Sequence, residues 1–377
     1  MKNLVISIAK KMLYAFYIFP IKNNRIVFSA YSGKQYSCNP KYISQWINHE
    51  HNGEYEIVWA FSNPASIDLP DKNIKKVKFK SLKYLYYVLT AKVIVDNVEA
   101  WSILPKRKGQ LVLNTWHGGG AYKGVGLMRR DSSDETDKNM LKKNERVSVY
   151  LSSSKVFTNL TLRQSFHFTG KVLEVGMPRN DILLQNDQQK ACDLKKKLGL
   201  DSDLKLVLYA PTFRKDTQYQ YILDEKLLVD ALHTRFGGKW KLLIRGHYYL
   251  DQINIVNSTA LDVSNYPDMQ ELLLISDILI TDYSSSMWDF SLMNKPGFLF
   301  MPDYSEYQHE REFYTPVSEW PYPACTSMNN LIDQIHSYNP EQSARKIIEH
   351  HLALGNCETG MASAYAGEKI IAFCQSK

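Results

Sequence analysis

The sequence predicts an α/β protein with two Rossmann-like domains that face each other across a cleft. Short β-branched or aromatic runs alternate with helical patterns along almost the whole chain, and this alternation is typical of parallel sheets with crossover helices. The length of 377 residues exceeds the usual size of one domain. A polar stretch at residues 185–203 lacks any strand pattern and divides the chain into two similar halves.

The individual elements follow from the same patterns. In the first half we expect strands at residues 25–31, 55–61, 91–97, 111–115, 148–152 and 171–175, and helices at 44–51, 81–90 and 155–167. In the second half we expect strands at 204–210, 239–245, 278–281 and 297–301, and helices at 224–236, 269–275, 287–293 and 329–336. The expected domains are residues 21–185 and 186–355, followed by a C-terminal helix at 356–377 that can pack back on the first domain.

The composition supports two folded cores and excludes several classes of protein. Hydrophobic residues make up 44% of the chain and aromatic residues 12%, which excludes a disordered or collagen-like chain. The cysteines are scattered, odd in number and without a C-x-x-C spacing: Cys38, Cys192, Cys325, Cys357 and Cys374. This pattern argues against a disulfide framework and a structural zinc site, and it fits a reducing cytoplasm.

The first residues, 1–20, are apolar but do not read as a signal peptide. Lys10 and Lys11 split the apolar run, and no small-residue cleavage site follows. The uncharged piece from Met12 to Phe19 is too short to cross a bilayer, which takes roughly 20 residues. Because the apolar residues recur at helical spacing, we expect an amphipathic helix in the membrane interface. The alternative is an ordinary first helix packed on the core.

The net charge is +7, and the basic residues are clustered. Six lysines lie between Lys72 and Lys83, and Lys106, Arg107 and Lys108 follow. Such patches attract phosphate-rich partners, whether lipid head groups, nucleic acid or an anionic polymer. The alternative is a solvated face without a partner.

The segment LVLNTWHGGGAYKGVG, residues 111–126, has the features of a catalytic loop. His117 follows directly on an apolar strand, where an imidazole can take a proton from an attacking hydroxyl. The glycines from Gly118 onward allow the backbone to come close to a ligand, Trp116 precedes the histidine, and Lys123 can balance phosphate charge. The alternative is a turn with a structural histidine.

A second segment, residues 278–300, predicts a phosphate site. A strand ends at Thr281 and Asp282, Tyr283 follows, and a helix begins at the serines that start with Ser284 and Ser285. Hydroxyl and backbone N–H groups at a helix N-terminus bind anions. The carboxylate at position 282 has an alternative explanation as a helix cap or a structural group.

Three shorter segments also place polar groups at expected strand ends. They contribute Thr212 and Arg214 in VLYAPTFR, Arg245 and His247 in LLIRGH, and Arg179, Asn180 and Asp181 in VGMPRNDIL. In open α/β sheets, ligands bind beyond the carboxyl ends of the strands. Basic and hydroxyl groups from both halves therefore indicate a cleft for a donor that carries a diphosphate.

Taken in order, these segments resemble the CDP-glycerol glycerophosphotransferase family of teichoic-acid and capsule polymer enzymes. The resemblance spans roughly residues 25–350 and rests on NTWHGGGAYK, VGMPRNDIL, YAPTFR, IRGH and TDYSSSMWDF followed by Lys295-Pro296. It implies a GT-B fold in which the N-terminal domain holds the acceptor and the C-terminal domain holds the CDP-alditol. It also implies that His117 is the base, that His247 contacts the donor phosphates, and that residues 281–285 form a donor-phosphate site.

The expected activity is transfer of glycerol phosphate or ribitol phosphate from CDP-glycerol or CDP-ribitol to a hydroxyl of a cell-surface polymer or lipid-linked acceptor, with release of CMP. His117 would deprotonate the acceptor, while Arg214, Arg245, His247 and the serines hold the diphosphate, so no cofactor or metal ion is expected. The resemblance implies peripheral attachment to the cytoplasmic face of the membrane through Met1–Pro20, on an anionic lipid surface. No nucleic-acid partner is expected, since no recognised module is present.

Two departures from the family pattern leave the substrates open. Many members read Trp-His-Gly-Thr-Pro-Leu-Lys, whereas this chain is one residue longer before Lys123. The family often shows Arg-Gly-Phe-Tyr where this chain has Arg311-Glu312-Phe313-Tyr314. The alternatives are a GT-B glycosyltransferase that uses a nucleotide sugar and a non-catalytic protein that binds an anionic polymer.

Overall fold

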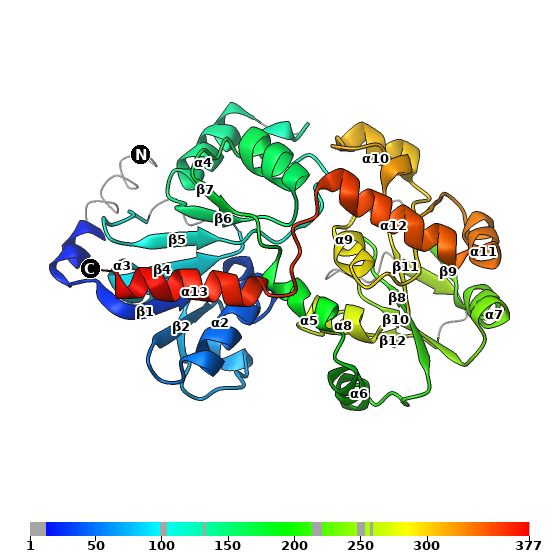
Figure 1. The fold of residues 1–377 in the computed structure, drawn as a ribbon, viewed down its shortest axis with the longest axis horizontal. Helices are drawn as coiled ribbons and strands as arrows, with labels where there is room; N and C mark the ends of the chain where they lie inside the picture. The colour runs from blue at the N-terminus through cyan, green and yellow to red at the C-terminus, as the bar shows by residue number, and fades with distance from the viewer. Residues whose placement is uncertain are drawn as a thin grey trace.

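A computed structural model describes residues 13–98, 104–130, 133–212, 221–246, 253–256 and 259–376. The chain forms two large parallel sheets of seven and six strands, each with helices around it, side by side in Figure 1. The predicted fold class, two Rossmann-like domains with parallel sheets, is therefore confirmed.

The first sheet has the strand order β3-β2-β1-β4-β5-β6-β7. Its strands are β1 (Lys22–Phe28), β2 (Glu56–Phe61), β3 (Lys75–Lys78), β4 (Ala91–Asp96), β5 (Leu111–Asn114), β6 (Val149–Leu151) and β7 (Lys171–Leu173). Helices α2 (Cys38–Glu50), α3 (Leu82–Thr90) and α4 (Asp134–Asn144) and a π-helix, η5 (Phe157–Ser165), connect them. The strand order reverses between β1 and β4, and such a switch point opens a crevice for a ligand.

The second sheet has the order β12-β10-β8-β13-β14-β15. Its strands are β8 (Lys205–Tyr209), β10 (Trp240–Ile244), β12 (Leu261–Asp262), β13 (Ile278–Thr281), β14 (Gly297–Phe300) and β15 (Ala324–Cys325), while β9 (Tyr221–Asp224) and β11 (Ile253–Val256) pair separately. The helices are α7 (Glu225–Phe236), α8 (Met269–Ile275), α9 (Ser286–Ser291), α10 (Tyr304–Glu310), α11 (Met328–His336) and α12 (Pro340–Leu354). Here the order reverses between β8 and β13, so a second crevice opens at that point.

The chain passes between the two domains twice. It first crosses through η6 (Pro178–Asn180) and α5 (Asp181–Gln185) to α6 (Gln188–Lys197), which packs on α8 of the second domain. It returns after α12, and the last helix, α13 (Ala362–Gln375), packs on α2 and β4 of the first domain (Figure 1). Ile370 and Cys374 of α13 are buried in the same apolar core as β1.

Short polar side chains begin most of the helices. The side-chain oxygen of the N-cap residue accepts a backbone N–H of the first turn at Ser81, Asp187, Asp224, Asp268, Ser327 and Asn339. Each of these bonds satisfies a backbone donor that the helix itself leaves without a partner. These caps explain why most helices start within a residue or two of the predicted positions.

Several elements differ from the prediction or were not predicted, and three of them have a plain physical reason. Helix α2 begins at Cys38 rather than at residue 44, because Pro40 falls in the first turn, where its missing N–H is not needed. The helix expected at 155–167 is a π-helix over most of its length. Part of the predicted lysine patch forms the edge strand β3, in which Val77 alone is buried and Lys75, Lys76 and Lys78 are exposed.

None of the helices in the described part of the chain combines the length and apolar character needed to cross a bilayer. Residues 1–12, which make up most of the predicted interface helix, lie outside the described residues.

Candidate active site

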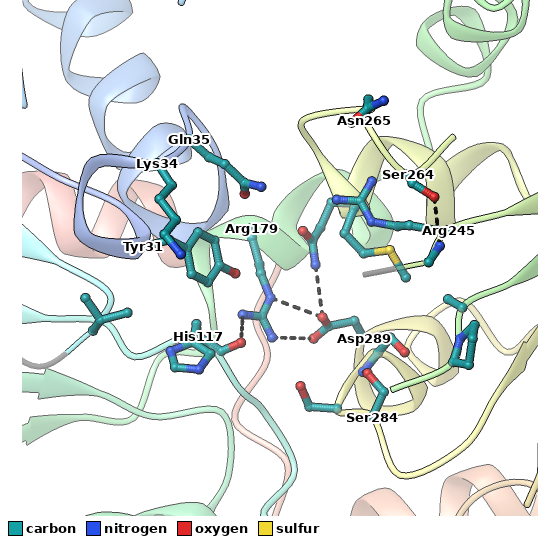
Figure 2. Close-up of a pocket in the computed structure, with 18 of the residues that line it drawn as sticks. Tyr31, Lys34, Gln35, His117, Arg179, Arg245, Ser264, Asn265, Ser284 and Asp289 are labelled. Carbon is teal, nitrogen blue, oxygen red and sulfur yellow. Dashed lines mark hydrogen bonds and ion pairs between the residues drawn. The ribbon is translucent and has the colours of Figure 1, made fainter. Parts of the chain in front are cut away.

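A cavity of about 570 Å³ lies between the two domains. In the first domain it is bordered by the segments that follow β1, β4 and β5, and in the second by the segments that follow β8, β10, β12 and β13. These are the carboxyl ends of strands on either side of both switch points, where ligands of such sheets bind. Figure 2 shows that polar side chains enter the cavity from both domains.

His117 lies on the wall formed by the first domain. Its Nδ1 is 2.9 Å from the backbone oxygen of Asn97, which can only accept a hydrogen bond. Nδ1 is therefore the protonated nitrogen, and Nε2 carries the lone pair that a general base needs. The ring packs against Trp116, with 4.3 Å between ring centroids, and against the edge of Tyr31 at 5.6 Å.

The turn that presents His117 is held in an unusual backbone conformation. Trp116 has φ of 52°, which is uncommon for a bulky residue and costs about 1–3 kcal/mol. The side-chain oxygen of Asn114 accepts from the Trp116 N–H at 2.8 Å, and the side-chain amide of Asn39 donates to the Trp116 oxygen at 3.0 Å. These bonds hold the backbone of Trp116, and so fix the position of His117 after strand β5.

The glycines after His117 lie against the second domain. A Cβ at Gly119 would be 2.5 Å from Cδ1 of Trp288 in α9, so only glycine fits there. A Cβ at Gly118 would be 3.7 Å from Oγ of Ser285, on the opposite wall of the cavity. The loop that carries the base is thus in direct contact with the second domain.

Arg179 and Asp289 form a buried ion pair between the domains. Nε and Nη2 of Arg179 donate to the two carboxylate oxygens of Asp289 at 3.1 and 3.0 Å, and Nη1 donates to the His117 backbone oxygen at 2.7 Å (Figure 2). Although burial opposes the charge, the Asp289 carboxylate raises the pKa of Arg179. Arg179 borders the cavity, and its charge is already committed to this pair.

The opposite wall carries Arg245, Ser264, Ser284 and Ser285. Nη1 of Arg245 donates to the Tyr266 oxygen at 2.7 Å, and Ser264 Oγ accepts from the Gly246 N–H at 2.9 Å. Helix α9 has only six residues, so its macrodipole is short. An arginine and three hydroxyls are groups that bind phosphate oxygens by hydrogen bonds.

The other predicted residues of the 281–285 segment, Thr281, Asp282 and Tyr283, lie behind the residues that border the cavity and support them. Thr281 donates to the Ala210 oxygen at 2.7 Å, and the Asp282 carboxylate accepts from the Thr212 N–H at 2.8 Å. Both bonds join the segment after β8 to the carboxyl end of β13. Tyr283 is fully buried and donates to Asp303 at 3.1 Å. None of these residues borders the cavity as described, in contrast to the two serines that follow.

Asn180, Asp181 and Lys123 lie at the junction of the domains rather than on the cavity wall. Asn180 donates to Glu358 at 2.9 Å. Asp181 accepts from the backbone N–H groups at the start of α13, and burial raises its pKa. Lys123 forms a β-bridge with Phe313 of the second domain. The added length of this loop places Tyr122 in the apolar core between the domains.

Two predicted donor-binding residues, Arg214 and His247, lie outside the described residues, so their roles remain predictions. The sequence reasoning missed Tyr31, Ser32, Lys34 and Gln35, which border the cavity after β1. The signal was present, because Ser32-Gly33 is a turn pair directly after a predicted strand.

Two buried carboxyl groups lie close to the site. Asp96, at the end of β4, accepts from Ser29 Oγ at 2.7 Å and from the Val98 N–H at 3.0 Å. Glu358 accepts from Trp288 Nε1 at 2.9 Å and from the Met177 N–H at 2.8 Å. Burial raises the pKa of each to about 7. Within the described residues no group of three His, Cys, Asp or Glu side chains is arranged to hold a metal ion.

Comparison with known proteins identifies relatives along nearly the whole chain. A family model described as CDP-Glycerol:Poly(glycerophosphate) glycerophosphotransferase matches residues 11–364. The teichoic acid poly(glycerol phosphate) polymerase of Bacillus spizizenii is 29% identical over 98% of this chain and 98% of that protein. The protein of that name from Staphylococcus epidermidis is 31% identical over 93% of this chain, but this chain spans only 51% of its length. The teichoic acid glycerol-phosphate transferase of Staphylococcus aureus is 30% identical over 86% of each.

Solved structures give the same result. The structure of the wall teichoic acid polymerase TagF matches with a TM-score of 0.85 and 29% identity, over 99% of this chain and 96% of that chain. The UDP-GlcNAc 2-epimerase of Neisseria meningitidis matches with a TM-score of 0.52 and 11% identity, over 92% of this chain and 100% of that chain, a likeness of fold alone. The two parallel sheets and these matches identify the fold as GT-B type, as the sequence predicts.

Proposed function

This chain belongs to the CDP-glycerol:poly(glycerophosphate) glycerophosphotransferase family, and from that membership we propose that it transfers polyol phosphate from a CDP-alditol to a hydroxyl of a teichoic-acid-type acceptor. It is a transferase of the CDP-glycerol glycerophosphotransferase type. CDP-glycerol is the preferred donor in this proposal, because three relatives with names that specify glycerol phosphate match it at 29–31% identity.

One observation carries the proposal: His117 enters the cavity between two domains with its Nδ1 fixed on the Asn97 oxygen. Nε2 takes the proton of the acceptor hydroxyl, and the oxygen attacks the phosphorus that bears the alditol. A new phosphorus–oxygen bond forms, the bond to the other phosphate breaks, and CMP leaves with the electron pair. The product is the acceptor extended by one polyol phosphate.

The second domain stabilises the charge that develops on the diphosphate. Arg245, Ser264, Ser284 and Ser285 border the cavity from the second domain, and Figure 2 shows Arg245 and Ser264 on the side opposite His117. Phosphoryl transfer relies mainly on positioning and on such charge stabilisation. The predicted contacts of Arg214 and His247 belong to the same role. These groups can act without a divalent metal ion, and the proposal includes none.

Attachment to the cytoplasmic face of the membrane is part of the proposal. Ile18, at the end of η1 (Ala15–Ile18), and Leu82, at the start of α3, are 79% and 76% exposed, and Lys83 is exposed beside them. Arg107 holds this region together by donating to the Phe19 and Leu89 oxygens, each at 2.8 Å. Exposed apolar side chains beside lysines are the features of a helix in an anionic lipid interface.

Binding to liposomes that contain phosphatidylglycerol tests this attachment. We expect removal of residues 1–20, or the double substitution Ile18→Asp and Leu82→Asp, to release the protein. Retention of both variants on the liposomes would refute the membrane part alone.

Release of CMP tests the activity. The enzyme is incubated with CDP-glycerol, CDP-ribitol or UDP-sugars, together with a lipid-linked glycerol phosphate acceptor. We expect release of CMP from a CDP-alditol by the wild type and none by His117→Ala, with binding of CDP-glycerol retained in the variant. Turnover of a UDP-sugar without turnover of either CDP-alditol would replace the proposal with a sugar transferase.

A further inference from the structure

The segment that follows β1 forms part of the cavity wall, and it has no part in the proposed reaction. Tyr31, Ser32, Lys34 and Gln35 all border the cavity. Figure 2 shows Tyr31, Lys34 and Gln35 on the side of the cavity opposite Arg245 and Ser264, with His117 close to Tyr31. This segment is one lip of the switch point between β1 and β4, where a ligand of the first sheet would bind.

The backbone of this segment is held in a conformation that side chains rarely adopt. Tyr31 and Ser32 have φ of 49° and 57°. A Cβ at Gly33 would be 3.0 Å from the Ser62 nitrogen, and Gly33 O accepts from that nitrogen at 2.7 Å, so the turn is packed tightly against the end of β2. Such strain persists where the surrounding structure enforces it, and it concentrates at ligand sites.

The base and this segment share one anchor. The side-chain oxygen of Asn97 accepts from the Tyr31 N–H at 2.8 Å, while the backbone oxygen of the same residue holds Nδ1 of His117 at 2.9 Å. Asn97 is fully buried at the end of β4. A group bound by the Tyr31–Lys34 segment is therefore held in a fixed position relative to Nε2 of His117.

The two domains place different charged groups on the cavity wall. Those of the second domain suit the donor, and those of the first domain suit the acceptor. The second domain supplies an arginine and several hydroxyls, which suit a diphosphate. Among the described residues of the first domain that border the cavity, the cations are Lys34 and Arg179, and the Lys34 side chain is exposed and forms no ion pair with a described residue. The Arg179 charge is neutralised by Asp289. One cation beside a base suits a chain that carries one negative charge per unit.

We propose that Tyr31, Ser32 and Lys34 form the subsite for the terminal polyol-phosphate unit of the acceptor, in which the Lys34 ammonium pairs with the phosphodiester that precedes the attacking hydroxyl. The inference rests on the proposed function. Tyr31 places an aromatic face beside the polyol carbons, and the hydroxyl reaches His117. It follows that the enzyme favours an acceptor that already ends in a polyol phosphate over an acceptor that ends in an uncharged sugar.

Acceptor kinetics test the subsite. Two synthetic acceptors are compared at saturating CDP-glycerol: a lipid-linked disaccharide that ends in glycerol phosphate units, and the same lipid without them. We expect Lys34→Ala to lower kcat/KM for the phosphate-bearing acceptor about tenfold, as loss of one charge-assisted contact implies, and to leave the KM for CDP-glycerol unchanged. Lys34→Arg should retain most of the activity. Lys226→Ala, an exposed lysine of α7 away from the cavity, serves as the matched control.

A binding measurement separates failure of this inference from failure of the proposed function. A fluorescent glycerol phosphate oligomer is titrated into each variant without donor, at low and high salt. We expect weaker binding by Lys34→Ala and a smaller salt dependence than in the wild type and in Lys226→Ala. Equal binding by all variants, or an equal loss of kcat/KM on both acceptors, would overturn the subsite even if CMP is released normally. An enzyme inactive on every CDP-alditol that still binds the oligomer through Lys34 would overturn the proposed function instead.

Discussion

Gly119→Ala tests whether the second domain positions the catalytic loop. The added methyl carbon would lie 2.5 Å from Cδ1 of Trp288, whereas ordinary contact begins at 3.4 Å, so the atoms must separate by about 0.9 Å. Trp288 is fully buried and its Nε1 donates to Glu358, so the indole has little freedom to move. The loop that carries His117 must move instead.

The size of the effect follows from this displacement. A misplacement of about 1 Å at a reacting group costs on the order of 100-fold in rate, and overpacking lowers the free energy of unfolding by about 1–3 kcal/mol. We therefore expect kcat for CMP release to fall about 100-fold while the Kd for CDP-glycerol changes little. Steady-state kinetics and urea denaturation measure the two quantities.

Gly118→Ala is the matched control for this substitution. Its added carbon would meet its nearest atom, Nε1 of Trp116, at 3.4 Å, which is an ordinary contact. We expect near-normal stability and a loss of kcat much smaller than in Gly119→Ala. If Gly119→Ala retains kcat within threefold of the wild type, or if both variants lose activity equally, the contact between the loop and α9 does not position the base.

Further predictions concern charge, protonation and metal ions. Asp289→Asn leaves the buried Arg179 guanidinium without its charged partner and should lower the free energy of unfolding by about 3–5 kcal/mol in urea titrations; a change under 1 kcal/mol would show that the pair is dispensable. Burial raises the pKa of Glu358 to about 7, so the folded state favours the protonated carboxyl, and stability is lost as pH rises from about 4.5 through 7. Between pH 5 and 8, Glu358→Gln should remove up to about 3 kcal/mol of this decrease in the free energy of unfolding. If the free energy of unfolding of wild type and variant changes in parallel with pH, the prediction is wrong. Burial lowers the pKa of His350 to about 4, so the unfolded chain binds the proton first, and stability falls as pH drops below about 6.5. Between pH 7.5 and 5 the wild type should therefore lose about 2 kcal/mol relative to His350→Gln, measured by urea denaturation, and identical losses would argue that the imidazole is not buried neutral. Incubation with excess EDTA should leave kcat unchanged, and inactivation that Mg²⁺ reverses would mean that a metal ion takes part.

The sequence predicted the fold because its main strands are continuous apolar runs. β4, β5, β8 and β13 are buried almost throughout, and each appears within a residue or two of its predicted position. β3 escaped prediction because an exposed edge strand of three lysines around Val77 has the pattern of a charged surface. β12 and β15 have two residues each, which is too short for any periodicity to show.

The candidate site was predicted in part. His117, Arg245, Ser284 and Ser285 border the cavity because each directly follows a strand, and strand ends can be read from the sequence. No sequence pattern distinguishes these residues from Tyr283 or Asp181, which also lie near a strand end or a helix start. In the structure Tyr283 points into the core and Asp181 caps α13. That difference depends on which way a side chain turns after the strand, and contacts across the domain interface decide it.

The position of α13 has a consequence for the order in which the protein folds during synthesis. Gly367 of this helix lies so close to Trp46 that a Cβ there would be 2.1 Å from the indole, and the helix fills the core beside α2. The ribosome makes α13 only after the whole second domain. The first domain is synthesised first, but the apolar face that α13 covers stays exposed until the second domain and α13 have been made. Truncation within α13 should leave this face exposed to chaperones and to aggregation.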